Sequence, residues 1–179
     1  FMHLQPMVTV LTNVDKDHLA NYDGSFEKLI TAFVEFVHNL PFYGLLVACI
    51  DDPVVKSILP RIQRPILTYG FDSDADFLAF DERQEGLTSS FSVRRRQGED
   101  LKIRLAMPGR YNVLNALAAV AIASDENIAD PHIVSGLEDF EGVSRRFQVH
   151  GRFSLEDGSF MLVDDYGHHP TEVKAVIEA

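Results

Sequence analysis

The chain has 179 residues, of which 46% are hydrophobic and 24% are charged, a composition typical of a globular domain and not of a disordered segment. Its formal net charge of −11 opposes binding to nucleic acid or to an anionic membrane, so we expect neither as a partner. Cys49 is the only cysteine, which excludes an intramolecular disulfide and a thiolate metal cluster. With no signal peptide and no apolar run long enough for a membrane span, the cytoplasm is the expected location.

The first third of the chain alternates apolar runs with helical patterns. Met7–Leu11 is a short apolar run that predicts a buried strand, and Phe26–Val37 repeats apolar residues at helical spacing. Leu45–Ile50 is continuously apolar, which is typical of a parallel strand covered on both faces. A short helix over Pro53–Leu59 and a strand over Ile66–Tyr69 follow. This order predicts a layered α/β sheet.

The middle of the chain has shorter and more polar segments. Phe77–Phe80, Leu87–Arg94 and Leu101–Leu105 are expected to form an antiparallel meander, because the last of them alternates apolar with basic residues. Arg94-Arg95-Arg96 could be interpreted as a phosphate site. Three consecutive residues cannot share one face of a strand, however, so a solvated edge is the favoured interpretation.

The last third is predicted to contain two helices, a hairpin and a final helix. In chain order these are Asn112–Ser124, Pro131–Glu138, the strands Phe147–Phe153 and Phe160–Val163 joined by a turn at Asp157-Gly158, and a helix that begins at Pro170.

The first candidate site is the polar loop after the strand Met7–Leu11. Polar groups beyond the carboxyl end of such a strand lie where open α/β sheets bind ligands. Asp15, Asp17 and His18 could hold a divalent metal there, although a histidine ligand suits zinc or manganese better than magnesium. The alternative is a loop in which the Asp side chains accept hydrogen bonds from turn amides.

The second candidate site is the beginning of the helix near Asn112. Asn112 and Asn115 are three residues apart, so their amides point the same way on a helix. Paired amides offer donors and acceptors that match the edge of an adenine. The favoured alternative, from spacing alone, is that Asn112 is an N-cap and Asn115 lies on a solvated face.

The third candidate site runs from Asp164 to Glu172 and again follows an apolar strand. It gathers acidic residues, imidazoles and a phenol into one strand-to-helix turn, and such a group can steer a metal, a nucleotide hydroxyl or a proton. The alternative is that Asp165 and Glu172 stabilise a helix N-terminus. Function is the favoured interpretation here.

A series of motifs, in chain order, resembles the Mur ligase family. They are Leu11-Thr12-Asn13 with Asp17-His18, His38-Asn39-Leu40-Pro41-Phe42-Tyr43-Gly44, Asp51-Asp52-Pro53, Thr68-Tyr69-Gly70-Phe71, Pro108-Gly109-Arg110 with Asn112 and Asn115, Arg145-Arg146-Phe147, and Asp164-Asp165-Tyr166-Gly167-His168-His169-Pro170-Thr171-Glu172. The motifs extend from near one end of the chain to the other, so the resemblance covers most of it.

The resemblance implies an α/β fold with a layered central domain, in which a mostly parallel sheet is flanked by helices and followed by a small antiparallel meander. We expect this ATP-binding domain over residues 1–145. Residues 146–179 would then supply the first strands and helix of a Rossmann-like C-terminal domain. The chain is thus interpreted as a fragment of a three-domain enzyme, whose UDP-sugar domain and P-loop precede Phe1.

The resemblance also implies an activity. Members of the family use ATP and Mg²⁺ to convert a substrate carboxylate into an acyl phosphate, which an amine then attacks. The stretches from His38 to Gly44 and from Asp164 to Glu172 are most similar to the member that joins L-alanine to UDP-N-acetylmuramate in peptidoglycan synthesis. The closest rival attaches a whole tripeptide to the same sugar nucleotide. A homodimer of the full-length enzyme is compatible with the resemblance.

The resemblance further assigns roles to single residues. His18 would be a magnesium ligand, Asn112 and Asn115 would face the adenine, Arg146 would reach the phosphates, Asp165 would contact the nucleotide, and Tyr166 and His168 would line the acceptor side. Arg146, Tyr166 and His168 are therefore the expected catalytic residues.

Three departures from the family pattern accompany these matches. No Gly-rich loop with a lysine is present, Ala20 replaces an acid that usually follows the metal-binding histidine, and Tyr111 replaces a histidine before the first asparagine. The competing hypothesis is a non-catalytic nucleotide-binding module, which lacks a P-loop in the parent protein.

Overall fold

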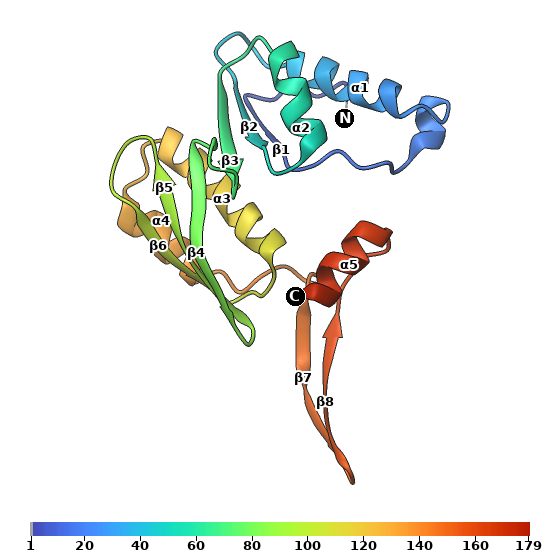
Figure 1. The fold of residues 1–179 in the computed structure, drawn as a ribbon, viewed down its shortest axis with the longest axis vertical. Coiled ribbons are helices and arrows are strands. Elements are labelled where there is room, and N and C mark those ends of the chain that lie inside the picture. The colour runs from blue at the N-terminus through green and yellow to red at the C-terminus, as the bar shows by residue number, and fades with distance from the viewer. Residues whose placement is uncertain (1) are drawn as a thin grey trace.

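The computed structural model describes residues 2–179 and is built on one six-stranded sheet (Figure 1). The strands lie side by side in chain order: β1 (Val8–Leu11), β2 (Leu45–Cys49), β3 (Ile66–Gly70), β4 (Phe77–Glu85), β5 (Thr88–Arg95) and β6 (Leu101–Leu105). Pairing is parallel from β1 to β4 and antiparallel from β4 to β6. The predicted α/β class is confirmed, and the antiparallel meander continues the parallel sheet.

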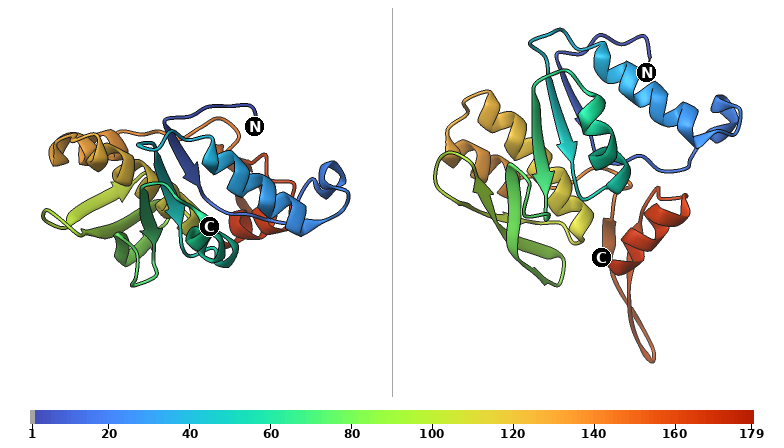
Figure 2. Two further views of the ribbon diagram at one scale, coloured as in Figure 1. Left: turned by 90° about the horizontal axis from the view of Figure 1, so that it is seen from above. Right: turned by 45° about the horizontal axis from the view of Figure 1, so that its top comes forward.

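Helices cover both faces of the parallel strands (Figure 1, Figure 2). They are α1 (Phe26–His38) and α2 (Pro53–Ile58) on one face and α3 (Arg110–Asp125) on the other, whereas α4 (Asp130–Glu138) packs on β6 and α3. Single 3₁₀ turns lie at Leu19–Tyr22 and Leu59–Arg61. Every residue of β2 is buried, with Leu45 and Val47 packed on the α3 side and Leu46 and Ala48 on the α1 side. The prediction that the apolar run from Leu45 forms a parallel strand covered on both faces is therefore confirmed.

Local signals explain where α1 begins and which side it buries. The Ser25 hydroxyl accepts the backbone N–H of Lys28 at 3.3 Å, as an N-cap does. The buried residues Leu29, Val34 and Val37 follow the spacing of one helical stripe together with Phe26, Ile30 and Phe33, which are partly buried against the same core.

The meander differs from the prediction at two places. β4 extends beyond Phe80 to Glu85, across an irregularity at Asp81, whose φ is 52°. The interpretation of the arginine triplet as solvated holds for Arg94 and Arg96, whose side chains are 57% and 78% exposed, and is wrong for Arg95. β5 is an inner strand, although its pairing with β6 ends at Val93. The Arg95 side chain is 8% exposed and donates two hydrogen bonds of 2.7 Å to the Asp130 carboxylate. Arg95 thus anchors α4 to the sheet.

The end of the chain forms a separate unit. β7 (Gln148–Leu155) and β8 (Gly158–Asp164) pair only with each other and extend away from the main sheet, and α5 (Pro170–Glu178) follows them (Figure 1). The predicted hairpin and final helix are confirmed. The division into domains at residues 145 and 146 stays a prediction. Among the described residues, no helix is long and apolar enough to cross a membrane.

Candidate functional site

The three predicted sites line one cavity of about 1110 Å³. The loop after β1 contributes Asp15, Asp17 and His18, α3 contributes Asn112 and Asn115, and the C-terminal segment contributes Arg146, Asp165, His169 and Glu172. The loop lies beyond the carboxyl end of β1, which is the edge of the sheet where α/β proteins bind ligands. Folding therefore joins motifs that lie more than a hundred residues apart in sequence.

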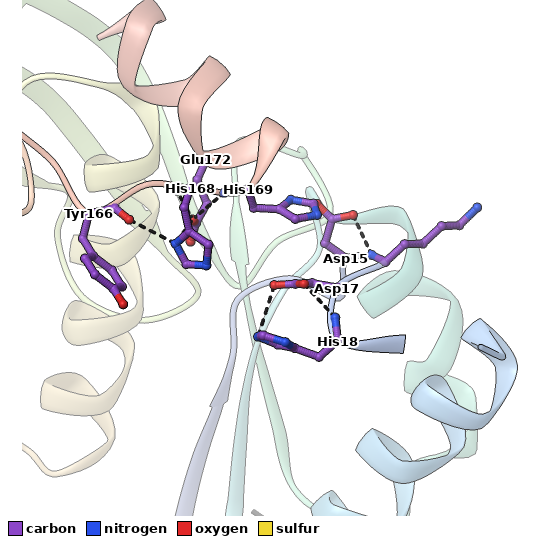
Figure 3. Close-up of polar contacts among 8 residues, drawn as sticks. Asp15, Asp17, His18, Tyr166, His168, His169 and Glu172 are labelled. Carbon is purple, nitrogen blue, oxygen red and sulfur yellow. Dashed lines mark hydrogen bonds and ion pairs between the residues drawn. The ribbon is translucent and has the colours of Figure 1, made fainter. Parts of the chain in front are cut away.

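The three polar residues of the first loop do not converge on one point. His18 has a left-handed backbone with φ 52°, and its Nε2 lies 3.4 Å from Asp17 Oδ2 (Figure 3). The Asp15 carboxylate instead accepts the Thr171 hydroxyl on α5 at 2.6 Å. Within residues 2–179, no group of three or more His, Cys, Asp or Glu side chains is arranged to hold a metal. A protein-only metal site formed by Asp15, Asp17 and His18 is thus not present.

The remaining pair, Asp17 and His18, suits a different kind of metal binding. The His18 side chain is 73% exposed, lines the cavity and lies beside a carboxylate. Magnesium usually keeps several waters and takes only one or two protein ligands together with substrate phosphates. The pair therefore fits an ion held mainly by phosphate and water.

The two asparagines of α3 have different surroundings. Because the helix begins at Arg110, with Gly109 as N-cap, Asn112 is the third helical residue and the N-cap interpretation is wrong. Asn112 is 5% exposed, and its Nδ2 donates to the Pro108 carbonyl at 2.7 Å. Asn115 is exposed on the cavity wall. Asn112 is thus rigidly held, whereas the Asn115 amide faces the open space.

Tyr111, which stands where the family pattern has a histidine, lines the cavity. Its hydroxyl oxygen is buried and makes no hydrogen bond of standard geometry among residues 2–179, although the Asn112 side chain lies close to it. Burial raises the pKa of Tyr111, and the negative charge of Asp165 acts in the same direction. The phenol is therefore neutral, and its oxygen is enclosed by protein atoms.

Asp165 fixes the junction before the hairpin. Its Oδ2 accepts the backbone N–H of Phe147 at 2.7 Å, and its Oδ1 accepts the backbone N–H of Gly167 at 2.7 Å. These are loop amides, so the interpretation of Asp165 as a stabiliser of the helix N-terminus does not hold. Arg146 precedes Phe147 and lies exposed on the cavity wall. The junction thus presents one guanidinium to the cavity.

The helix α5 begins at the histidine pair. Glu172 accepts the backbone N–H groups of His168 and His169 at 3.2 and 3.3 Å, which completes a capping box (Figure 3). The backbone N–H of His168 is the main cause that lowers the pKa of Glu172. The helix-terminus interpretation is thus confirmed for Glu172.

Tyr166 and His168 are not brought into the cavity wall. The Arg145 guanidinium lies over the Tyr166 ring at 4.7 Å, and His168 Nδ1 is 3.1 Å from the Tyr166 carbonyl. Both side chains are exposed beside the cavity. Their predicted place on the acceptor side stays a prediction.

Among residues 2–179, the sheet and the cavity at the carboxyl ends of its parallel strands define an α/β protein with a large candidate ligand site. The Mur ligase middle domain matches residues 1–123, more than half of the chain, and the chain belongs to the Mur ligase family.

Solved structures give the same result for the fold. MurF from Acinetobacter baumannii shares 26% identity with this chain at a TM-score of 0.80, over 96% of this chain and 36% of that one. UDP-N-acetylmuramate–alanine ligase MurC from Thermotoga maritima shares 25% identity at a TM-score of 0.80, over 99% and 38% of the two chains. The fold is also that of Thermotoga maritima MurF in complex with ADP, at 22% identity and a TM-score of 0.79, over 97% and 38%. The chain therefore spans little more than a third of the length of these proteins.

Proposed function

We propose that this chain is the nucleotide-binding centre of an ATP-dependent ligase that joins L-alanine to UDP-N-acetylmuramate through an acyl phosphate. The observation that carries the proposal is the shared cavity, because it brings His18, Asn115 and Arg146 from separate motifs around one space. A structural relative of this chain was solved with ADP, which supports a nucleotide as the ligand.

The nucleotide would lie along the cavity with its base toward α3. Asn112 and Asn115 would recognise the adenine edge, since an amide both donates and accepts hydrogen bonds. Asp165 would contact the nucleotide close to the hinge before β7. Arg146 would meet the phosphates, where a planar guanidinium can bind two oxygens at once.

Magnesium would be held beside His18, with Asp17 next to it and the phosphates as its other ligands. When bound, the ion supplies the charge neutralisation that phosphoryl transfer needs. Tyr166 and His168 would act on the acceptor side once both substrates are present. The proposal also places the boundary between an ATP-binding domain and a C-terminal ligase domain at residues 145 and 146.

The choice of L-alanine rests on the stretches from His38 to Gly44 and from Asp164 to Glu172. The first of these has a structural role in this chain. Asn39 Nδ2 donates to the carbonyls of Met2 and Leu4, and Arg64 donates to those of His38 and Leu40. The stretch from His38 to Gly44 therefore supports L-alanine as the substrate only through its resemblance to the family motif. It does not do so through a contact with the substrate.

Phosphate release by the full-length parent protein tests the proposal. With ATP, magnesium and UDP-N-acetylmuramate present, we expect release that depends on L-alanine. With the sugar nucleotide and the cell-wall tripeptide instead, we expect only background release. Preference for the tripeptide would assign the protein to the recycling ligases, and no release with either acceptor would favour the non-catalytic module.

A further inference from the structure

One polar contact links the loop after β1 to the first turn of α5. The Thr171 hydroxyl donates to Asp15 Oδ2 at 2.6 Å, although the two residues are 156 positions apart. His169 Nδ1 lies 3.4 Å from the same carboxylate oxygen (Figure 3). The loop that carries His18 is thus joined directly to the segment that carries Asp165.

Both carboxylate oxygens of Asp15 are engaged. Oδ1 accepts the backbone N–H of Lys16 at 2.6 Å, which fixes the direction of the side chain, and Oδ2 faces α5. The Thr171 hydrogen bond is the main cause that lowers the pKa of Asp15, so the contact favours the charged carboxylate. A hydrogen bond to an ionised acceptor is stronger than one between neutral groups.

Little else holds α5 in place. None of its residues is buried, and β7 and β8 pair only with each other. Gln84 donates to the Ala179 carbonyl at 2.6 Å and so supports the other end of the helix. Because α5 buries so little apolar surface, these polar contacts must determine how closely it approaches the sheet.

The approach of α5 sets the width of the cavity. Thr171, Glu172, Ala175 and Val176 form one wall, and Asn13, His18 and Asn21 are among the residues of the loop that faces them. If α5 moved away, Arg146 and Asp165 would move with it, because β7 and α5 belong to the same C-terminal segment.

We propose that Asp15 is a positioning residue whose bridge to Thr171 holds the C-terminal segment closed over the cavity. Asp15 then acts on the site through the placement of the opposite wall and does not itself touch the nucleotide. The inference rests on the proposed function only for the identity of the ligand.

The distance between two spin labels, measured by double electron–electron resonance, tests this bridge. The labels are placed at the exposed positions Glu35 on α1 and Lys174 on α5, and Cys49 is too buried, at 2% exposure, to be labelled. We compare the wild type with Thr171→Val, which removes the hydroxyl at nearly constant volume, and with Thr171→Ser, which retains it.

The wild type and Thr171→Ser should be mostly closed, with a main narrow population at short distance. In Thr171→Val the ratio of closed to open molecules should fall on the order of tenfold, as expected for a lost hydrogen bond to a charged group. Thr171→Val should have no further effect in an Asp15→Ala background, because the partner is already missing. Identical distributions for the wild type and Thr171→Val, or additive effects in the double variant, would overturn the proposal.

A second measurement separates this inference from the proposed function. The distances between the spin labels are first recorded without nucleotide, so they report only on the bridge between Asp15 and Thr171. MgADP is then added to Thr171→Val, and we expect the closed population to be restored. If MgADP changes the distance distribution of neither the wild type nor Thr171→Val, the cavity is not a nucleotide site. The conclusion on the bridge between Asp15 and Thr171 is not affected by that result.

Discussion

The Asp165 carboxylate accepts the backbone N–H of Phe147 at 2.7 Å and thereby joins the end of β8 to the beginning of β7. The same side chain also accepts the N–H of Gly167, so it holds the residues on both sides of the hairpin base. Its removal leaves two amides without their partner.

Asp165→Ala should therefore loosen the hairpin. The expected cost is about 1–3 kcal/mol of local stability, the range for amides that lose a charged acceptor. Hydrogen exchange of Phe160–Val163 should accelerate, while that of Leu45–Cys49 should not change.

Already in the wild type we expect weaker protection of β8 than of β2, because β8 is largely exposed and β2 is buried. Equal protection of the two strands would contradict the placement of the hairpin outside the core.

Tyr111→Phe should affect the stability of the ligand-free protein and its affinity for the nucleotide differently. The buried hydroxyl makes no hydrogen bond of standard geometry in the described structure, and burying such a group costs about 1–3 kcal/mol. Its removal should leave the melting temperature of the ligand-free protein unchanged or raise it. Nucleotide affinity should change little, because the enclosed oxygen presents no surface to a ligand. A lower melting temperature would show that the hydroxyl is already hydrogen-bonded in solution.

Gly109 should not tolerate a side chain. Its φ of 92° favours glycine, and an added Cβ would lie 2.7 Å from Cε1 of Tyr111 and 2.8 Å from Cβ of Ala179. Gly109→Ala should destabilise the protein by at least about 1 kcal/mol. Thermal unfolding measures this cost, and Gly136→Ala, where an added Cβ meets nothing within 4 Å, is the matched control.

The cap of α5 should respond to acid. The pKa of Glu172 is lowered from its ordinary value of 4.5, chiefly by the backbone N–H of His168. Because the folded pKa lies below the unfolded one, the cap contributes its full stability above pH 4.5, and this contribution is lost as the pH falls through the folded pKa. Acid titrations followed by circular dichroism should show this loss in the wild type. Glu172→Gln should lack that part of the pH dependence.

The fold was largely predictable because its signals are local. The continuous apolar run of β2, the helical spacing of α1 and the alternation in β6 each report the burial of a single element. β4 was predicted too short, since the residues after Phe80 are polar and pair only across a bulge. Arg95 was misinterpreted because its partner Asp130 is 35 positions away.

The candidate site was predictable only in part. The motifs identified the loop near His18, the α3 asparagines and the Asp165 turn, but spacing gave no information on how they meet. The bridge between Asp15 and Thr171 joins positions 156 residues apart, so only the folded chain brings it into view. The place of Asn112 inside the helix depends on Gly109, which caps α3 three residues earlier.

NMR titration of this chain with MgADP measures whether the cavity binds a nucleotide. Without a P-loop we expect weak binding, with a dissociation constant on the order of 0.1–1 mM. The backbone signals of residues 111–116 and 146–147 and of His18 should shift together and saturate. Asn115→Ala should weaken the binding at least about fivefold, whereas Gln63→Ala, which removes an exposed amide outside the cavity, should not. Shifts that are absent from the cavity, or an Asn115→Ala titration identical to the wild type, would contradict the account.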